Sequence, residues 1–230
     1  MNSAVIVAAG RGTRMGPGID KLFLEVAGAP VVAHTWRRID RADGIDEVVL
    51  VVRSGMELAF SEIADRHVLP TKPWKMVLGG AERQDSVWNG LVATHASAEL
   101  VLIQDGARPC THPQHMADCL EAAHRTGASV GGFRVTDTIK ESDGSCRVAR
   151  HLDRSRLWAV QTPQCFRRQV LLEALAEVKR RGIQVTDDTA ACEWIGQEVL
   201  LVEGRWPNPK VTTPADLPYV ALLLQGHGSA

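Results

Sequence analysis

Short apolar runs that alternate with amphipathic segments are the feature that most limits how this chain can fold. Runs rich in Val, Ile and Leu are typical of strands buried on both faces, as in a parallel sheet. They occupy residues 3–9, 47–53, 74–80, 99–106, 128–135 and 198–204. Segments with helical character lie between or after them, at 31–42, 56–67, 82–95, 113–126, 167–181 and 214–224. The alternation predicts an α/β fold with a doubly wound, mostly parallel central sheet.

Residues 136–166 interrupt this alternation. The stretch is long and polar, is rich in charged and turn-forming residues, and has no helical period. A stretch of this kind within a compact domain is usually a functional loop or an excursion. Its SDGS centre, flanked by segments with β character, predicts a protruding hairpin. Because 230 residues suffice for one large α/β domain, we expect residues 1–230 to form a single domain with 136–166 as an extended β-arm.

Charge and cysteine content narrow the class of protein. A formal net charge of -1 argues against a general nucleic-acid binder, which usually carries a basic stripe, but it permits a local cationic pocket. The five cysteines are far apart and include no C-x-x-C pair, which favours free thiols in a reducing compartment. No apolar stretch approaches the roughly 20 residues of a membrane span. We therefore expect a cytoplasmic protein that binds neither nucleic acid nor a membrane.

A glycine-rich turn, AAGRGTRMG at residues 8–16, follows the first apolar run. Its glycine spacing, G-x-G-x-x-x-G, is one residue longer than the dinucleotide-binding fingerprint. The second predicted strand ends in Val52-Arg53, without the acidic residue that holds a ribose in that fingerprint. No Gly-Lys-Ser/Thr closes a triphosphate loop of the Walker type. An NAD(P)-dependent oxidoreductase is therefore disfavoured.

The turn still offers backbone N–H groups that can surround an anion. Arg11, Arg14 and Lys21 lie within a few residues of one another. Three cations so close to exposed amides repel one another unless an anion lies between them. A polyphosphate meets this need, and a solvated basic turn is the alternative interpretation.

The turn is also the first of several motifs that together resemble a known family. An apolar strand followed by A-A-G-x-G-x-R-M and then a Lys is similar to the N-terminal signature of sugar-nucleotide pyrophosphorylases and related nucleotidyltransferases. The later motifs are GGAERQDSVWNGL (79–91), DGARPC (105–110), DTIK (137–140), LDRSRLWAVQTPQCF (152–166), TDDTAACEW (186–194) and EGRWPNPKVTTPADL (203–217). In this combination and order they resemble the 2-C-methyl-D-erythritol 4-phosphate cytidylyltransferase family over nearly the whole chain.

The resemblance implies a Rossmann-like nucleotidyltransferase fold and a specific reaction. CMP passes from CTP to the phosphate of 2-C-methyl-D-erythritol 4-phosphate, a step of non-mevalonate isoprenoid synthesis, and pyrophosphate leaves. A phosphate monoester has a second pKa near ~6 and is already mostly dianionic, so no general base is needed. Catalysis should consist of positioning and of cations placed where charge develops. By resemblance these cations are Arg14, Lys21 and Lys210.

The resemblance also indicates where the nucleotide binds. Asp105 ends a predicted strand, where ligands gather in open α/β sheets, and by resemblance it lies at the ribose and helps to hold Mg²⁺; a local turn or helix cap is its alternative role. We expect Mg²⁺, or another divalent cation, to be held chiefly by the triphosphate. Ala81 stands where many relatives have Asp, which removes a side-chain acceptor for cytosine. The expected nucleotide-binding residues are Ala8, Ala9, Gly10, Gly12, Gly79, Gly80, Ala81, Ser86, Asp105 and Gly106.

The acceptor phosphate needs its own cationic site. Thr138 and Arg154 match family positions on an arm that reaches across a homodimer and completes the neighbouring site, although Arg156 competes with Arg154 and a solvated arm residue is the alternative role. Asp187 offers a carboxylate to alditol hydroxyls. The expected substrate-binding residues are Arg108, Thr138, Arg154, Thr162, Thr186, Asp187 and Thr212.

Two other functions compete with this interpretation. The first is a cytidylyltransferase for ribitol 5-phosphate or another sugar phosphate. It needs the same cationic sites, because its ligands are also CTP and a small alditol phosphate. A non-catalytic nucleotide-binding regulator is disfavoured because Arg14, Lys21, Asp105 and Lys210 are all present.

Overall fold

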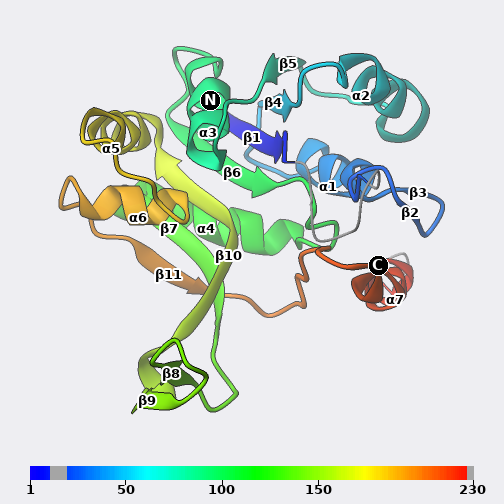
Figure 1. Ribbon diagram of the computed structural model, residues 1–230. Coiled ribbons are helices and arrows are strands. Elements are labelled where there is room, and N and C mark those ends of the chain that lie inside the picture. Colours follow the sequence, from blue (N-terminus) through cyan, green and yellow to red (C-terminus); the bar gives the residue numbers. More distant parts are fainter. Residues whose placement is uncertain (11–19, 227–230) are drawn as a thin grey trace.

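The structure, a computed structural model, describes residues 1–10 and 20–226. A seven-stranded sheet with the order β11-β7-β10-β6-β1-β4-β5 forms its centre (Figure 1). Only β10 is antiparallel to its neighbours in this sheet, so the mostly parallel α/β fold is confirmed. The strands are β1 (Asn2–Ala8), β4 (Glu47–Val52), β5 (Trp74–Leu78), β6 (Leu100–Asp105), β7 (Ala128–Arg134), β10 (Trp158–Arg167) and β11 (Leu200–Glu203).

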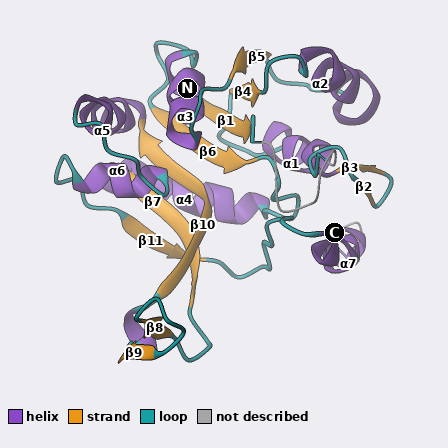
Figure 2. Ribbon diagram, in the orientation of Figure 1, coloured by secondary structure: helices purple, strands orange, loops and turns teal. Residues whose placement is uncertain are grey.

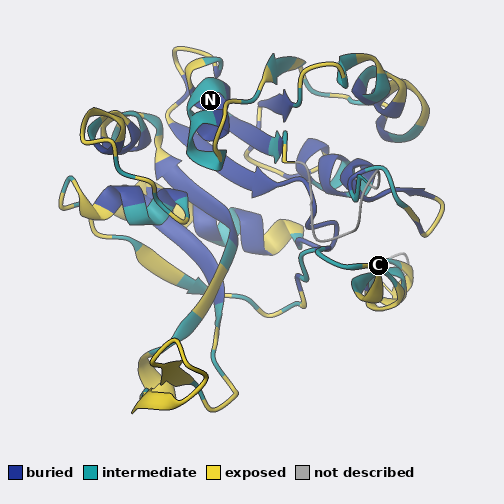
Figure 3. Cartoon of the chain, viewed as in Figure 1, coloured by how far each residue is buried: buried dark blue, intermediate teal, exposed yellow. Residues whose placement is uncertain are grey.

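Helices cover both faces of this sheet (Figure 2). One face packs against α1 (Val31–Asp40), α2 (Glu57–Ile63, continued by a π-helical turn over Ala64–Val68) and α4 (Pro113–Thr126). The last helix, α7 (Leu217–Gly226), joins the same apolar core but lies beside residues 25–26 (Figure 1). The other face of the sheet packs against α3 (Arg83–Val92), α5 (Arg168–Arg180) and α6 (Asp188–Glu193). Every residue of β4 and β6 is consequently buried, which explains why their sequences are continuous apolar runs (Figure 3). No helix in the described part of the chain is both long and apolar enough to cross a membrane.

The order of the strands places a crevice between β1 and β6. From β1 the chain builds outward through β4 to β5, and it then returns to the other side of β1 to form β6. Ligands of open α/β sheets bind at such a switch point, beyond the carboxyl ends of the strands. The carboxyl ends of β1, β4, β5 and β6 lie at one edge because these four strands are parallel.

The predicted hairpin is present, and it projects from the sheet. It consists of β8 (Lys140–Ser142) and β9 (Val148–His151), an antiparallel pair around the SDGS sequence whose residues are all exposed (Figures 1 and 3). Two further short strands, β2 (Glu25–Val26) and β3 (Ala29–Pro30), pair with each other before α1.

The expected boundary of the arm, 136–166, was wrong at its C-terminal end. Residues 158–166 belong to β10, which lies in the central sheet between β6 and β7 and is buried from Thr162 to Phe166. The polar residues of QTPQ at 161–164 interrupt the apolar pattern of this strand, and its register with β7 shifts between Val160 and Gln164. The excursion is therefore confined to the stretch between Arg134 and Trp158.

Candidate active site

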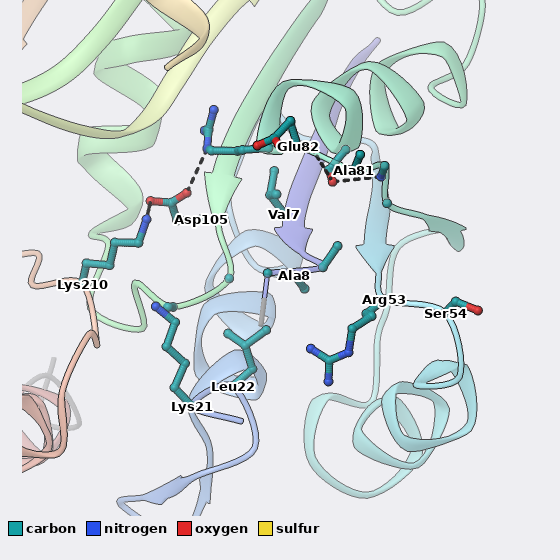
Figure 4. A pocket seen from close by; sticks show the side chains of 18 of the residues that line it. Val7, Ala8, Lys21, Leu22, Arg53, Ser54, Ala81, Glu82, Asp105 and Lys210 are labelled. Atoms are coloured by element: carbon teal, nitrogen blue, oxygen red, sulfur yellow. Dashed lines mark hydrogen bonds and ion pairs between the residues drawn. The ribbon is translucent and has the colours of Figure 1, made fainter. Parts of the chain in front are cut away.

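A cleft of about 670 Å³ lies over the carboxyl ends of β1, β4, β5 and β6 (Figure 4). Twelve of the predicted site residues line it, although they come from five separate parts of the chain. These residues are Ala8, Ala9, Gly10, Lys21, Gly79, Gly80, Ala81, Ser86, Asp105, Gly106, Lys210 and Thr212. Two others, Gly12 and Arg14, lie outside the described residues.

The two glycines after β5 allow this loop to pack closely against its neighbours in the protein. A Cβ on Gly79 would overlap the side chain of Ala9 and lie 2.8 Å from Ser86 Oγ, and a Cβ on Gly80 would overlap the Cβ of Asp85. Ser86 Oγ accepts a hydrogen bond from the Gly80 N–H at 3.1 Å and donates one to the Glu82 carbonyl at 3.2 Å. Ser86 therefore fixes the loop, and the loop backbone faces the cleft.

Asp105 lies among three cations at the end of β6. Its Oδ2 is 2.8 Å from Lys210 Nζ and 3.4 Å from Arg108 Nε, and its Oδ1 is 3.7 Å from Arg83 Nε. Burial raises the pKa of this carboxyl, but Lys210, Arg83 and Arg108 outweigh that effect and hold the pKa at about 2. Asp105 is therefore ionised throughout the physiological range and holds Lys210 at the cleft.

Arg83 is a cleft residue that was not predicted. It begins α3, and its Nη1 and Nη2 donate to the two carboxylate oxygens of Asp188 at 3.0 and 2.9 Å. Asp188 is fully buried at the start of α6. Burial acts against the charge of Arg83, yet Asp188 and Asp105 raise its pKa above the ordinary value. Both partners stand in motifs quoted above, but no local pattern indicates a pair that spans 105 residues.

Lys21 enters the cleft from the end of the glycine-rich segment. Its Nζ donates to the carbonyl of Val211 at 2.9 Å, and the Val211 N–H donates to the Ala107 carbonyl at 2.9 Å. The neighbour of Val211 is Lys210, so this short segment brings both lysines to the same part of the cleft. The structure thereby joins two of the three predicted catalytic residues.

Two of the predicted substrate-binding residues lie behind the cleft and support it. Thr162 is buried, and its Oγ1 accepts the Asp105 N–H at 3.1 Å. Arg108 donates from Nη1 to the Asn208 carbonyl at 2.8 Å, and Asn208 Nδ2 donates to the Thr162 carbonyl at 2.8 Å. Sequence reasoning missed Asn208, whose side chain links the segment before Lys210 to β10.

Asp187 caps the N-terminus of α6. Its carboxylate accepts hydrogen bonds from the Ala190 N–H at 2.9 Å, from Thr189 Oγ1 at 3.0 Å and from Gln164 Nε2 at 3.1 Å. These contacts give the side chain one fixed position. Thr186, immediately before it, is exposed and does not line the cleft.

Thr138 and Arg154 lie on the exposed arm. Arg154 donates from Nη1 to the Thr136 carbonyl within the arm. The arm projects away from the sheet (Figure 1), and neither residue lines the cleft of its own chain.

The carboxylates of the cleft bear on whether a divalent cation fits there. Of the described lining residues, Glu82 and Asp105 carry carboxylates, and Glu82 is engaged in the capping box of α3. Within residues 1–10 and 20–226, no group of three or more His, Cys, Asp or Glu side chains is placed to hold a metal ion. Asp105 alone suits a cation whose other ligands are phosphate oxygens.

Comparison with known proteins shows which family the chain belongs to. The family model described as 2-C-methyl-D-erythritol 4-phosphate cytidylyltransferase (IspD) matches residues 2–225. A relative of that name from Geobacillus kaustophilus is 42% identical over 221 residues, which cover 96% of each chain.

Solved structures agree as well. The 4-diphosphocytidyl-2C-methyl-D-erythritol synthase of Anaerococcus prevotii superposes with a TM-score of 0.84 at 29% identity and covers 97% of both chains. The 2-C-methyl-D-erythritol 4-phosphate cytidylyltransferase of Thermus thermophilus has a TM-score of 0.78 at 33% identity, covering 98% of this chain and 100% of that one. The chain belongs to the 2-C-methyl-D-erythritol 4-phosphate cytidylyltransferase family.

Proposed function

We propose that this chain transfers CMP from CTP to the phosphate of 2-C-methyl-D-erythritol 4-phosphate. The products are pyrophosphate and 4-diphosphocytidyl-2-C-methyl-D-erythritol, an isoprenoid precursor of the non-mevalonate pathway. The observation that carries the proposal is the meeting of Lys21, Lys210 and Asp105 in one cleft that Gly10 also lines. Family membership supports the choice of both substrates.

The chemistry needs cations rather than a base. An oxygen of the acceptor phosphate attacks the α-phosphorus of CTP, and the bond between that phosphorus and the oxygen bridging to the β-phosphate breaks. Lys21, Lys210 and Arg14 stabilise the negative charge of the five-coordinate phosphorus. Lys210 starts from its ion pair with Asp105 and turns to the phosphate when CTP binds. Each such donor contributes on the order of 3 kcal/mol to lowering the barrier.

The cytosine is read mainly by backbone. Gly79, Gly80 and Ala81 line the cleft, and backbone without large side chains supports close approach by a planar base. The hydroxyl of Ser86 holds this loop in shape. Ala8, Ala9, Gly10, Gly12 and Gly106 complete the nucleotide site.

We infer that Mg²⁺, or another divalent cation, binds with the triphosphate and that Asp105 is its protein ligand. The cation neutralises part of the charge of the triphosphate and so eases the approach of a second anion. Asp105 fits this role because its carboxylate faces the cleft and its low pKa keeps it ionised.

The acceptor site is completed by a second chain. We propose a homodimer in which Thr138 and Arg154 of one arm reach the cleft of the neighbour, beside Thr186, Asp187 and Thr212. Arg108 and Thr162 hold the site from behind. The exposed arm, with Val148 58% exposed on β9, supports such an exchange.

We also propose that residues 1–230 act as a single domain in the cytoplasm. The same sheet carries both groups of helices, and its two faces form the two apolar cores. All five cysteines are free thiols, which suits a reducing compartment.

A pyrophosphate-release assay tests the proposed reaction. The four nucleoside triphosphates are each combined with 2-C-methyl-D-erythritol 4-phosphate, ribitol 5-phosphate and a simple sugar phosphate, with and without Mg²⁺. We expect CTP with methylerythritol phosphate to give the fastest release, and Lys210→Ala protein purified in the same way to give little. A preference for ribitol phosphate supports the second transferase, and no release with any pair contradicts both.

A further inference from the structure

Arg53 is a cation of the cleft that the mechanism above does not use. It follows β4 directly, and β4 lies between β1 and β5 in the sheet, so Arg53 stands near the middle of the cleft. The Arg53 carbonyl accepts the Met56 N–H at 3.1 Å, and Gly55 supplies the left-handed φ of 84° that this tight turn requires. The turn therefore fixes the backbone from which the Arg53 side chain extends.

The guanidinium of Arg53 lies beside the residue that precedes Lys21, a lysine that the proposed mechanism assigns to the phosphates. Its Nη2 is 2.9 Å from Oδ2 of Asp20, the residue that immediately precedes Lys21. The other carboxylate oxygen of Asp20 accepts the Leu22 N–H at 3.1 Å, which keeps Asp20 at the end of the glycine-rich segment. In Figure 4 the Arg53 side chain extends away from Ala81 of the base-reading loop.

The pairing of Arg53 is weaker than that of the other arginine in the cleft. Arg83 makes a two-fold contact with a fully buried carboxylate, whereas Arg53 contacts Asp20 through one nitrogen, with side chains that are 27% and 19% exposed. Partly exposed pairs of this kind contribute little to stability. A guanidinium has five N–H donors in a planar fork that matches a phosphate. Arg53 can therefore exchange its partner at little cost.

The mechanism assigns Lys21, Lys210 and Arg14 to the α-phosphorus of CTP. It places no cationic side chain at the β- and γ-phosphates, where most of the charge of CTP lies. We propose that Arg53 binds these two phosphates, which leave as pyrophosphate, and that Asp20 is its partner only while the cleft is empty. The inference rests on the proposed function, because it assumes that a nucleoside triphosphate occupies the cleft.

The number of phosphates on the ligand provides the test. Binding of CTP, CMP and inorganic pyrophosphate is measured by calorimetry, with Mg²⁺, for the wild type, Arg53→Ala, Arg53→Lys and Asp20→Asn, with Arg125→Ala on α4 as a matched surface control. We expect Arg53→Ala to weaken the binding of CTP and of pyrophosphate about 10- to 100-fold, the range for a charged hydrogen bond. The affinity for CMP should stay nearly unchanged. Arg53→Lys should lose less affinity for CTP and pyrophosphate than Arg53→Ala, because lysine keeps the positive charge. Asp20→Asn should bind CTP as tightly as the wild type or more tightly, because a competing carboxylate is removed.

Three outcomes would overturn the inference. Equal losses for CTP and CMP would assign Arg53 to the base, the ribose or the fold. Unchanged binding of CTP and pyrophosphate to Arg53→Ala would remove it from the site. An Asp20→Asn variant that loses affinity as Arg53→Ala does would show that the ion pair only holds the loop. If wild type and variants bind as expected but no acceptor gives pyrophosphate release, the phosphate site stands and the proposed reaction fails; a wild type that binds none of the three ligands contradicts both.

Discussion

Lys210 and Asp105, which are 105 residues apart in the sequence, form an ion pair with 2.8 Å between Nζ and Oδ2. Asp105 is held by β6, and Lys210 belongs to a segment without regular structure. Hydrogen bonds on both sides of Lys210 fix that segment, among them one from Arg108 to the Asn208 carbonyl and one from the Val211 N–H to the Ala107 carbonyl. The position of the proposed catalytic lysine therefore depends on tertiary contacts on both sides of it.

Replacement of Lys210 by Ala should lower kcat by about 10²- to 10³-fold, as loss of one donor to a developing negative charge does. The KM for CTP should change much less, because the other cations of the cleft still bind the triphosphate. Steady-state pyrophosphate release checks this, with Lys179→Ala on α5 as a control for the loss of one surface lysine. Wild-type turnover in Lys210→Ala contradicts the assigned role.

Breaking the Arg83–Asp188 pair should destabilise the fold. Arg83→Met leaves the fully buried Asp188 without its counter-charge, which typically costs about 3–5 kcal/mol of unfolding free energy. The double variant Arg83→Met/Asp188→Leu should recover most of this loss, because two apolar side chains need no partner. Urea unfolding of the two single variants and the double variant measures the coupling. Additive losses would show that the pair does not act as a unit.

Asp105 should contribute to the dependence of stability on acid. Its pKa is lowered from the ordinary value to about 2, so its contribution is complete above about pH 5 and is lost as pH falls toward 2. A depression of this size corresponds to about 2 kcal/mol. Urea unfolding at pH 6 and near pH 2 should therefore show a smaller acid loss for Asp105→Asn than for the wild type. Equal losses would mean that the three cations do not depress this pKa.

A methyl group on Gly79 should impair nucleotide binding. Its Cβ would overlap Ala9 and crowd the Ser86 hydroxyl, so the base-reading loop must move away from β1. We expect Gly79→Ala to raise the KM for CTP about tenfold, which corresponds to the lower end of the 1–3 kcal/mol typical of overpacking. Gly226→Ala is the matched control, since a Cβ there meets nothing within 4 Å. An unchanged KM in Gly79→Ala would place the base elsewhere.

Arm exchange predicts that two inactive chains restore activity together. Arg154→Ala lacks the arm contact and Lys210→Ala lacks the cleft cation, so each homodimer should be inactive. In a mixed dimer, the cleft of the Arg154→Ala chain keeps its own Lys210 and receives an intact arm. Co-expression should yield about a quarter of wild-type activity, because about half of the dimers are mixed and each has one complete site. A mixture no more active than its components contradicts exchange.

Most of the sheet was predictable because its strands are buried on both faces. The run EVVLVV at 47–52 has no polar residue after Glu47 and occupies β4 in full. In contrast, β10 was assigned to the arm because Gln161, Thr162 and Gln164 break its apolar run, and the six-residue α6 is too short to show a helical period. Elements whose residues contribute to both the site and the core are therefore the hardest to predict from one sequence.

Site residues could be predicted from the sequence where a motif falls at the end of a predicted strand. Ala8 and Asp105 follow from their place at the ends of β1 and β6. Arg83 and Asn208 could not be predicted in this way. Arg83 meets its partner Asp188 only when α6 packs, and Asn208 meets Thr162 only when β10 packs. In the sequence, Arg53 served only to show that the second strand lacks the acidic residue of the dinucleotide-binding fingerprint. In the cleft, its positive charge is the property that matters.

A structure of the protein with CTP and Mg²⁺ is the most direct test of the central claim. We expect the α-phosphorus to lie between the glycine-rich turn and Lys210, with the ammonium groups of Lys21 and Lys210 within about 3–4 Å of its oxygens. An α-phosphorus bound away from the crevice between β1 and β6, with Lys21 and Lys210 still on Val211 and Asp105, would contradict it.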